Sequence, residues 1–330
     1  MTLVKRKNMN VAVIGLGSMG KRRIRLIKET YPDYIICGVD GREDRRDEAS
    51  EQFGINCYAG LDSIKESIDC VFVCTSPLSH NMIIKDALAN GYHVFTELNL
   101  VDDGYEANIR TAKDKNLTLF LSSTFLYREE IRYLRSKIDE AGKWNYVYHI
   151  GQYLPDWHPW ENYKDFFLGD KRTNGCREIL AIELPWLIST FGDVKDINAV
   201  SDKMTDLNID YNDNFVIQLS HDNGNKGCLI VDVVSPVAVR KFEVYSEGRY
   251  MAWNGTPDSL FEFNPVNKKL ECVSLSEKAE HMEGYSSFVV ENAYKNEIKE
   301  FFNVLLDKCE PVYGFEQDKK ILELIDRIGA

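Results

Sequence analysis

Short apolar runs alternate with amphipathic stretches through the first 121 residues of the chain. The runs are bounded by glycine, proline or polar residues, which is typical of strands buried on both faces of a parallel sheet. The stretches between them repeat with the period of a helix. The predicted strands are residues 11–14, 34–40, 69–74, 93–96 and 117–121, and the predicted helices are residues 21–30, 82–90 and 104–115. This alternation predicts a doubly wound α/β domain built on a parallel sheet.

The pattern changes after about residue 127. A helix is predicted at 129–141, and the alternation of polar and apolar residues at 144–153 indicates a half-buried antiparallel strand. The polar turn at 222–225, Asp-Asn-Gly-Asn, is typical of a hairpin. The other predicted elements are an apolar helix at 179–191, strands at 214–219, 228–234, 241–246 and 250–253, and helices at 285–309 and 315–328.

These elements predict two domains. Residues 1–122 form the doubly wound domain. Residues 123–330 form an α+β domain with a large, mostly antiparallel open sheet, which we expect to bind the substrate and to mediate oligomerisation. The last helix could return to pack on the first domain.

Composition and charge exclude several classes of function. A net charge of −12 opposes binding to nucleic acid or to an anionic membrane. No stretch approaches the roughly 18 apolar residues of a membrane span, and no apolar leader is seen at the N-terminus. The eight cysteines form no C-x-x-C pair, which fits a reducing, cytoplasmic location. The six histidines show no H-x-x-x-H spacing, so no metal site is expected.

A glycine motif directly follows the first predicted strand. Residues 15–20 read Gly-Leu-Gly-Ser-Met-Gly, the G-x-G-x-x-G pattern that binds a dinucleotide when it lies between a strand and a helix. The first glycine permits a tight turn, the second lets the backbone approach a diphosphate, and the third lets the helix pack on the strand. The N–H groups at the start of the helix then face the anion. The alternative is a glycine-rich turn that binds no ligand.

An acidic residue closes the second predicted strand, 20 residues after the last glycine. A carboxylate at this place bonds the ribose hydroxyls and repels a 2′-phosphate, so the sequence predicts a Rossmann domain that prefers NAD to NADP. Arginines at positions 42, 45 and 46 leave NADP open. The cofactor residues predicted from this motif are Gly15, Leu16, Gly17, Ser18, Met19, Gly20, Asp40 and Arg42.

With these residues placed, the whole chain resembles the glucose–fructose oxidoreductase, inositol dehydrogenase and MocA (Gfo/Idh/MocA) family. The resemblance is strongest over residues 9–122, where the glycine motif, Asp40, residues 74–80 (Cys-Thr-Ser-Pro-Leu-Ser-His) and residues 91–97 (Gly-Tyr-His-Val-Phe-Thr-Glu) follow in the family's order. It implies that the segment after the strand at 69–74 borders the nicotinamide. The cofactor residues that the resemblance adds are Thr75, Ser76, Pro77, His80 and Glu97.

The sequence departs from this family at both of its usual catalytic signatures. Where the family has Glu-Lys-Pro, this chain has Glu97, Leu98 and Asn99, and Leu98 cannot polarise a hydroxyl as a lysine does. The second signature places an Asp and then a His on a helix that ends in Phe-Gly. Counted back from the Phe-Gly at 191–192, the His position falls on Ile182 and the Asp position on Ile179 or its neighbour.

Few titratable residues remain for acid–base work, which needs a group within hydrogen-bond reach of the proton. The catalytic candidates are His158, Glu178 and Glu97. His158 is an imidazole in an aromatic loop, with an ordinary pKa suited to proton transfer. Each has a plainer interpretation: a packed loop histidine, a residue of a structural ion pair, and a carboxylate that caps or packs near the cofactor. Glu183 is interpreted in the same way as a paired helix charge. The predicted substrate residues are Tyr153, Asp156, Trp157, Tyr163 and Arg177.

Two functions stay open at this point. The first is an NAD(H)-dependent oxidoreductase that moves hydride to or from a carbonyl or alcohol carbon of a sugar, cyclitol or similar polyol derivative. The second is a dinucleotide-binding sensor without redox turnover, which the missing lysine and histidine favour. Elimination or hydrolysis through a transient ketone is a third possibility. The resemblance also implies a homodimer or homotetramer.

Overall fold

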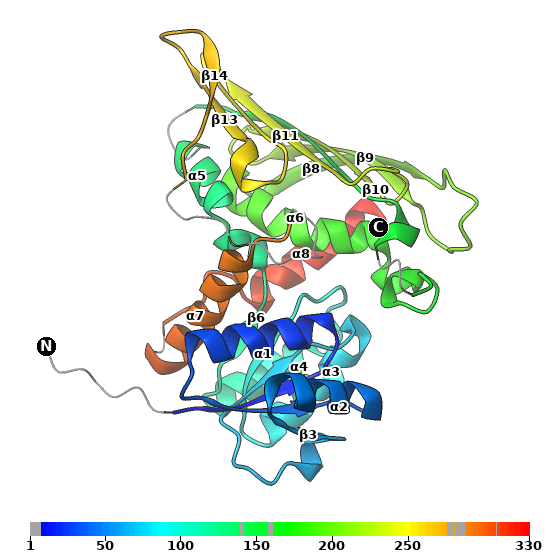
Figure 1. Cartoon of the computed structure of the whole chain (residues 1–330). Coiled ribbons are helices and arrows are strands. Elements are labelled where there is room, and N and C mark those ends of the chain that lie inside the picture. The colour runs from blue at the N-terminus through cyan, green and yellow to red at the C-terminus, as the bar shows by residue number, and fades with distance from the viewer. Residues whose placement is uncertain (1–7, 139–141, 158–160, 276–279, 281–287, 308) are drawn as a thin grey trace, which may run out of the picture. The chain divides into compact units, whose positions relative to one another are not determined.

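The computed structural model describes residues 8–138, 142–157, 161–275, 280, 288–307 and 309–330. The chain divides into two compact units (Figure 1). The first comprises Met1–Ser122 and Tyr294–Lys319, and the second comprises Ser123–Ala293 and Lys320–Ala330. The first unit thus takes in the segment Tyr294–Lys319, which the sequence analysis had assigned to residues 123–330.

The first unit is built on a six-stranded parallel sheet with the order β3-β2-β1-β4-β5-β6. The sheet confirms the predicted doubly wound domain. The order reverses between β1 and β4, and ligands of such sheets bind at the carboxyl ends of the strands beside this reversal. The strands are β1 (Asn10–Ile14), β2 (Ile35–Val39), β3 (Asn56–Tyr58), β4 (Cys70–Val73), β5 (His93–Thr96) and β6 (Leu119–Leu121).

Helices cover both faces of this sheet. Within this unit the sequence analysis missed α2 and the short β3. Helix α2 buries only Ala49 and shows almost no apolar period. Helix α3 begins at Pro77, five residues before the predicted start, because proline suits the first turn of a helix. The helices of the unit are α1 (Ser18–Thr30), α2 (Glu43–Phe53), α3 (Pro77–Ala89), α4 (Tyr105–Asp114) and most of α7 (Glu291–Asp307).

Helix α7 joins the first unit through an aromatic cluster. The ring of Phe301 meets those of Phe72, Phe95 and Phe120 edge-on at 5.1 to 5.7 Å. Such contacts stabilise by about 0.5–1.5 kcal/mol each beyond the area that they bury. This packing explains why the segment from Tyr294 belongs to the first unit, and α7 lies beside α1 on the same face of the sheet (Figure 1).

The second unit is built on an eight-stranded sheet with the order β14-β13-β12-β11-β7-β10-β9-β8. Its strand pairs are antiparallel except for β7 and β10, which confirms the predicted mostly antiparallel sheet. Helices α5 (Glu129–Ile138) and α6 (Gly175–Phe191) and the end of α8 (Phe315–Ile328) complete the unit. The strands are β7 (Asn145–Gly151), β8 (Val194–Asp202), β9 (Asn214–His221), β10 (Lys226–Asp232), β11 (Val239–Ser246), β12 (Arg249–Trp253), β13 (Leu260–Asn264) and β14 (Lys269–Cys272).

The two faces of this sheet differ in burial. Alternate side chains of β7 and β11, such as Tyr148 and Phe242, are fully buried and pack against Trp186 of α6. On the opposite face Val147 and Val216 are each 41% exposed. The second unit therefore carries a broad open sheet face. Within the described part of the chain, no helix is long and apolar enough to cross a membrane.

Candidate functional site

The turn between β1 and α1 holds its glycines in the places that the sequence predicts. Gly15 has a left-handed backbone, with φ of +92°, and its N–H donates to the Val39 carbonyl at 2.8 Å. A Cβ atom on Gly15 would lie 2.7 Å from the carbonyl oxygen of Cys74. Only glycine combines this backbone conformation with such close contact. The turn is thus pressed against the end of β4.

The surroundings of the other two glycines differ, because Gly20 is tightly packed and Gly17 borders open space. A Cβ on Gly20 would lie 1.8 Å from the Gly15 carbonyl oxygen, so α1 packs directly on the turn. A Cβ on Gly17 would meet only the guanidinium of Arg45, at 3.7 Å. Gly17 is the N-cap of α1, whose first N–H groups lack intrahelical partners. Open space above a helix start is suited to a diphosphate, which a side chain at Gly17 would displace.

Asp40 ties the second strand to this turn. Its carboxylate accepts the Leu16 N–H at 2.8 Å and the Arg42 N–H at 2.9 Å. Two further acceptor positions of a carboxylate remain for ribose hydroxyls. The Arg42 side chain, predicted to contact the cofactor, is exposed to solvent and pairs with Asp44. The guanidinium that approaches both Asp40, at 3.7 Å, and Gly17 is that of Arg45.

The segment after β4, which the resemblance assigns to the nicotinamide side, lies beside the glycine turn. The methyl group of Thr75 would lie 2.9 Å from a Cβ on Gly15. Ser76 is the N-cap of α3 and Pro77 its first residue. His80 is different from these three, because it is 2% exposed and both ring nitrogens are bonded within the unit.

Glu97 ends β5 at the same edge of the sheet and is held by Arg23 of α1. Arg23 Nε and Nη2 donate to its two oxygens at 2.6 and 3.0 Å. The same Nη2 donates to Glu297 of α7 at 2.7 Å, and Ser122 donates to Glu297 at 2.9 Å. Arg23 is fully buried between these carboxylates. The pairing favours the interpretation of Glu97 as a packing residue near the cofactor rather than a proton carrier.

Helix α6 of the second unit carries Glu178 and, one turn later, Ile182, and both side chains are half-buried. Burial raises the pKa of Glu178 to about 7. Among the described residues its carboxylate has no hydrogen-bond or ion-pair partner, so desolvation is not offset by a nearby charge. A carboxyl group that titrates near neutral pH can both give and take a proton there.

The predicted substrate residues are gathered only in part. The ring of Trp157 packs on Gly175 at the start of α6, three residues before Glu178. Arg177 turns away to the C-terminal segment, where it donates to Asp326 at 2.7 Å. Tyr163 accepts the Asn208 N–H through its hydroxyl at 3.2 Å. Asp156 is exposed and Tyr153 is half-buried. His158 lies outside the described residues.

Glu183 has a structural role, in agreement with its interpretation as a paired helix charge. It is fully buried on α6 and accepts four hydrogen bonds, two of them from Arg240 at 2.6 and 3.0 Å. The others come from the Tyr148 hydroxyl at 2.9 Å and the Trp186 indole at 2.6 Å. All of its acceptor capacity is used, so it has none left for a substrate.

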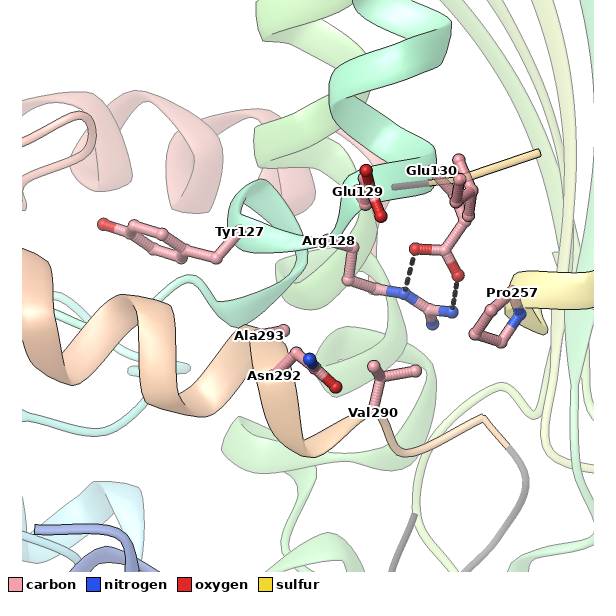
Figure 2. A pocket seen from close by; sticks show the side chains of 9 residues that line it. Tyr127, Arg128, Glu129, Glu130, Pro257, Val290, Asn292 and Ala293 are labelled. Atoms are coloured by element: carbon pink, nitrogen blue, oxygen red, sulfur yellow. Dashed lines mark hydrogen bonds and ion pairs between the residues drawn. The ribbon is translucent and has the colours of Figure 1, made fainter. Parts of the chain in front are cut away.

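A small cavity of the second unit lies beside the ion pair between Arg128 and Glu130 (Figure 2). Its volume of about 20 Å³ is close to the space that one water molecule needs. Pro257 and Val290 line it, and none of the predicted site residues does. This cavity is too small for a sugar or a nicotinamide.

Comparison with known proteins finds a family whose model matches the N-terminal part of the chain. Residues 9–121 match the model of the oxidoreductase family Gfo/Idh/MocA, described as an NAD-binding Rossmann fold. The predicted resemblance and the predicted NAD cofactor are thereby confirmed for this part of the chain.

Two curated relatives share this region. A myo-inositol 2-dehydrogenase from Thermotoga maritima is 26% identical over 140 residues, which are 40% of this chain and 41% of that protein. A dTDP-3,4-didehydro-2,6-dideoxy-α-D-glucose 3-reductase from Actinomadura kijaniata is 27% identical over 138 residues, 40% of this chain and 42% of that protein. The chain therefore spans about two fifths of the length of the curated relatives that it matches.

Solved structures resemble the chain over nearly its whole length. A levoglucosan dehydrogenase, solved with NADH and levoglucosan, matches with a TM-score of 0.81 at 17% identity, covering 98% of this chain and 96% of that one. A UDP-N-acetylglucosamine 3-dehydrogenase from Acidithiobacillus ferrooxidans matches with a TM-score of 0.77 at 16% identity, covering 98% and 97%. At these identities the likeness shows the fold.

Proposed function

We propose, from the family match over residues 9–121, that the chain is an NAD(H)-dependent oxidoreductase. Its reaction moves hydride to or from a carbonyl or alcohol carbon of a sugar, cyclitol or similar polyol derivative. The observation that carries the proposal is the open space above Gly17, next to a turn in which Gly15 and Gly20 are tightly packed. The curated relatives are named for an inositol and for a glucose derivative, which supports a polyol-like substrate.

The residues of the first unit fit a bound dinucleotide. The α1 N-terminus and Gly17 would hold the diphosphate, Asp40 the adenosine ribose, and Thr75 would border the nicotinamide. When bound, NAD supplies the two-electron acceptor or donor for the hydride. Arg45 adds a positive charge beside Gly17, which favours a phosphate there.

In this proposal Glu178 carries the proton. Its carboxylate accepts the hydroxyl proton when an alcohol is oxidised, and its carboxyl group returns the proton when a carbonyl is reduced. The pKa of about 7 suits both directions. His158 stays a second candidate from the sequence, and Trp157, whose ring packs on Gly175 at the start of α6, would offer an apolar face to a sugar ring.

The substitution Glu178→Gln tests this role. We expect kcat to fall by about 100- to 10,000-fold, the usual contribution of a positioned acid or base, while the Kd for NADH is unchanged. In the unsubstituted protein the reduction rate should fall as pH rises through about 7, because the acid form is lost, and the oxidation rate should rise over the same interval. A panel of sugars and cyclitols, followed by NADH absorbance, provides the measurement.

Glu323→Gln serves as the control, since Glu323 is exposed on α8 in the same unit. His158→Ala is measured in parallel. Full turnover in the Glu178 variant, with its pH profile unaltered, would assign the proton to another group. A loss of turnover confined to the His158 variant would assign the proton transfer to His158.

A sensor without turnover remains the second candidate, and a specific observation favours it. Leu98 and Ile182 occupy the positions where the resemblance expects lysine and histidine, and both are half-buried apolar residues. If the protein binds NADH but oxidises none of it across the panel, the sensor is the better description. Stoichiometric oxidation of bound NADH by any carbonyl compound of the panel would eliminate it.

We further propose a homo-oligomer formed through the open sheet face. Val200 and Val216 are register partners on this face and are 68% and 41% exposed. Contiguous exposed apolar surface of this kind marks an interaction site. We expect light scattering to give a mass of two or four chains, and Val216→Glu to reduce it. Val237→Glu, in a loop, is the control. A single-chain mass for the unsubstituted protein would contradict the proposal.

A further inference from the structure

His80 links two loops at the carboxyl edge of the Rossmann sheet. Its Nε2 lies 2.9 Å from the carbonyl oxygen of Thr75, in the turn that follows β4. Its Nδ1 lies 2.6 Å from the side-chain oxygen of Asn99, in the segment that follows β5. The ring is 2% exposed, so it cannot reach a ligand directly. Its influence on a ligand must pass through these two segments.

Both links persist when the imidazole is neutral. Burial lowers the pKa of His80 and favours the neutral ring, which has one donor and one acceptor nitrogen. The Thr75 carbonyl can only accept, so Nε2 bears the proton. The Asn99 amide can present either its oxygen or its NH2 group to Nδ1, and the NH2 group suits the neutral ring. The side chains of His80 and Asn99 therefore act as a pair.

Asn99 is buried beside a polar network in the interior of the unit. Burial and the Asp318 charge raise the pKa of Tyr105, and the nearby side chain of Asn99 acts in the opposite direction. The Tyr105 and Tyr313 hydroxyls donate to Asp318 at 2.5 and 2.6 Å, and Asp318 is fully buried. Asn99 is 2% exposed and contacts His80 on the other side. A buried side chain in close-packed surroundings can hold its neighbour in place.

We propose that His80 and Asn99 are positioning residues that set the Thr75 turn for the nicotinamide half of the dinucleotide. The inference rests on the proposed cofactor site, because it assumes that this turn borders the nicotinamide. Within the part of the chain that the structure describes, the other hydrogen bonds of the turn are local: the Ser79 hydroxyl oxygen lies 2.8 Å from Thr75 Oγ1 and 2.7 Å from the Ser76 carbonyl oxygen. Without the imidazole, the Thr75 carbonyl loses its link to the β5 segment.

The test compares two probes that share the adenosine half. NADH reaches both halves of the crevice, whereas ADP-ribose lacks the nicotinamide. We expect His80→Ala to raise the Kd for NADH by about 10-fold, the effect of one lost buried hydrogen bond, and to change the Kd for ADP-ribose by less than about twofold. Asn99→Ala should likewise raise the Kd for NADH and leave the Kd for ADP-ribose nearly unchanged. The double variant should bind NADH no more weakly than either single variant.

His93→Ala is the matched control, because His93 lies at the opposite end of β5, where its Nδ1 accepts the Thr118 N–H at 2.8 Å. We expect it to leave both Kd values unchanged. Equal weakening of NADH and ADP-ribose in the His80 variant would indicate a general structural role and overturn the proposal, as would an unchanged Kd for NADH. If the unsubstituted protein bound neither probe, the proposed function itself would fail instead.

Discussion

Gly17→Val should weaken dinucleotide binding strongly while leaving the protein folded. We expect the Kd for NADH to rise about 100-fold or more, a loss of roughly 2.8 kcal/mol. The backbone at Gly17, with φ of −74° and ψ of −164°, is open to any residue, so valine adds no strain. Its side chain instead fills the space in which the diphosphate would approach the N–H groups of α1. NADH fluorescence titration and calorimetry measure the affinity.

Two other glycines make this prediction specific. Gly60 has an extended backbone, and a Cβ there would meet only Ser63 Oγ at 4.0 Å, so Gly60→Ala should retain both affinity and melting temperature. Gly20→Ala would place its Cβ 1.8 Å from a carbonyl oxygen, so it should lose stability as well as affinity. Wild-type affinity in the Gly17 variant would remove the basis of the proposed function.

The fold was predictable where local signals agree with one another. Apolar runs closed by turn residues located β1, β2, β4, β5 and β6, and a glycine at 20 with a carboxylate 20 residues later located the cofactor turn. Each signal has a local cause: strand burial on both faces, or a backbone that tolerates no Cβ. Helix α2 lacked such a cause, since only Ala49 is buried on it.

The candidate site was less predictable because its contacts are distant in sequence. Sequence reasoning left Glu97 open as either a catalytic group or a carboxylate that caps or packs near the cofactor, because its partner Arg23 lies 74 residues away. The arginine follows Gly20 by three residues on α1, which was a usable signal for a side chain beside the turn. For Asn99 the only signal was that it replaces the family's proline. Arg45 was noted near Asp40, but its approach to Gly17 depends on how α2 packs.

Arg23→Met should destabilise the first unit more than any change on the surface. Arg23 is the shared partner of two carboxylates, Glu97 and Glu297, and is fully buried. Removing one partner of a buried ion pair costs about 3–5 kcal/mol, because it leaves an uncompensated charge. Amide hydrogen exchange in β4, β5 and β6 measures the loss. Tryptophan fluorescence should not report this loss, because the tryptophans that the structure describes, at 144, 157, 186 and 253, belong to the second unit.

The loss of stability in Arg23→Met should also depend on pH, and the direction of this dependence can be predicted. Burial raises the pKa of Glu297, and the charge of Arg23 opposes that rise. Without Arg23 the folded-state pKa moves further above the unfolded value of about 4.3, so the folded protein binds more protons than the unfolded chain. Stability is then fully present below about pH 4.3 and is lost as pH rises through the folded-state pKa. The deficit should therefore be larger at pH 8 than at pH 5.

The double variant Arg23→Met with Glu297→Gln separates charge from packing. It leaves no ionisable group at position 297, so it should recover part of the stability and most of the pH dependence should vanish. Arg25→Met is the control on the same helix, because the pair between Arg25 and Glu29 is solvent-exposed and contributes about 0.5 kcal/mol or less. A deficit in the Arg23 variant that matched this control would show that the buried network does not stabilise the first unit.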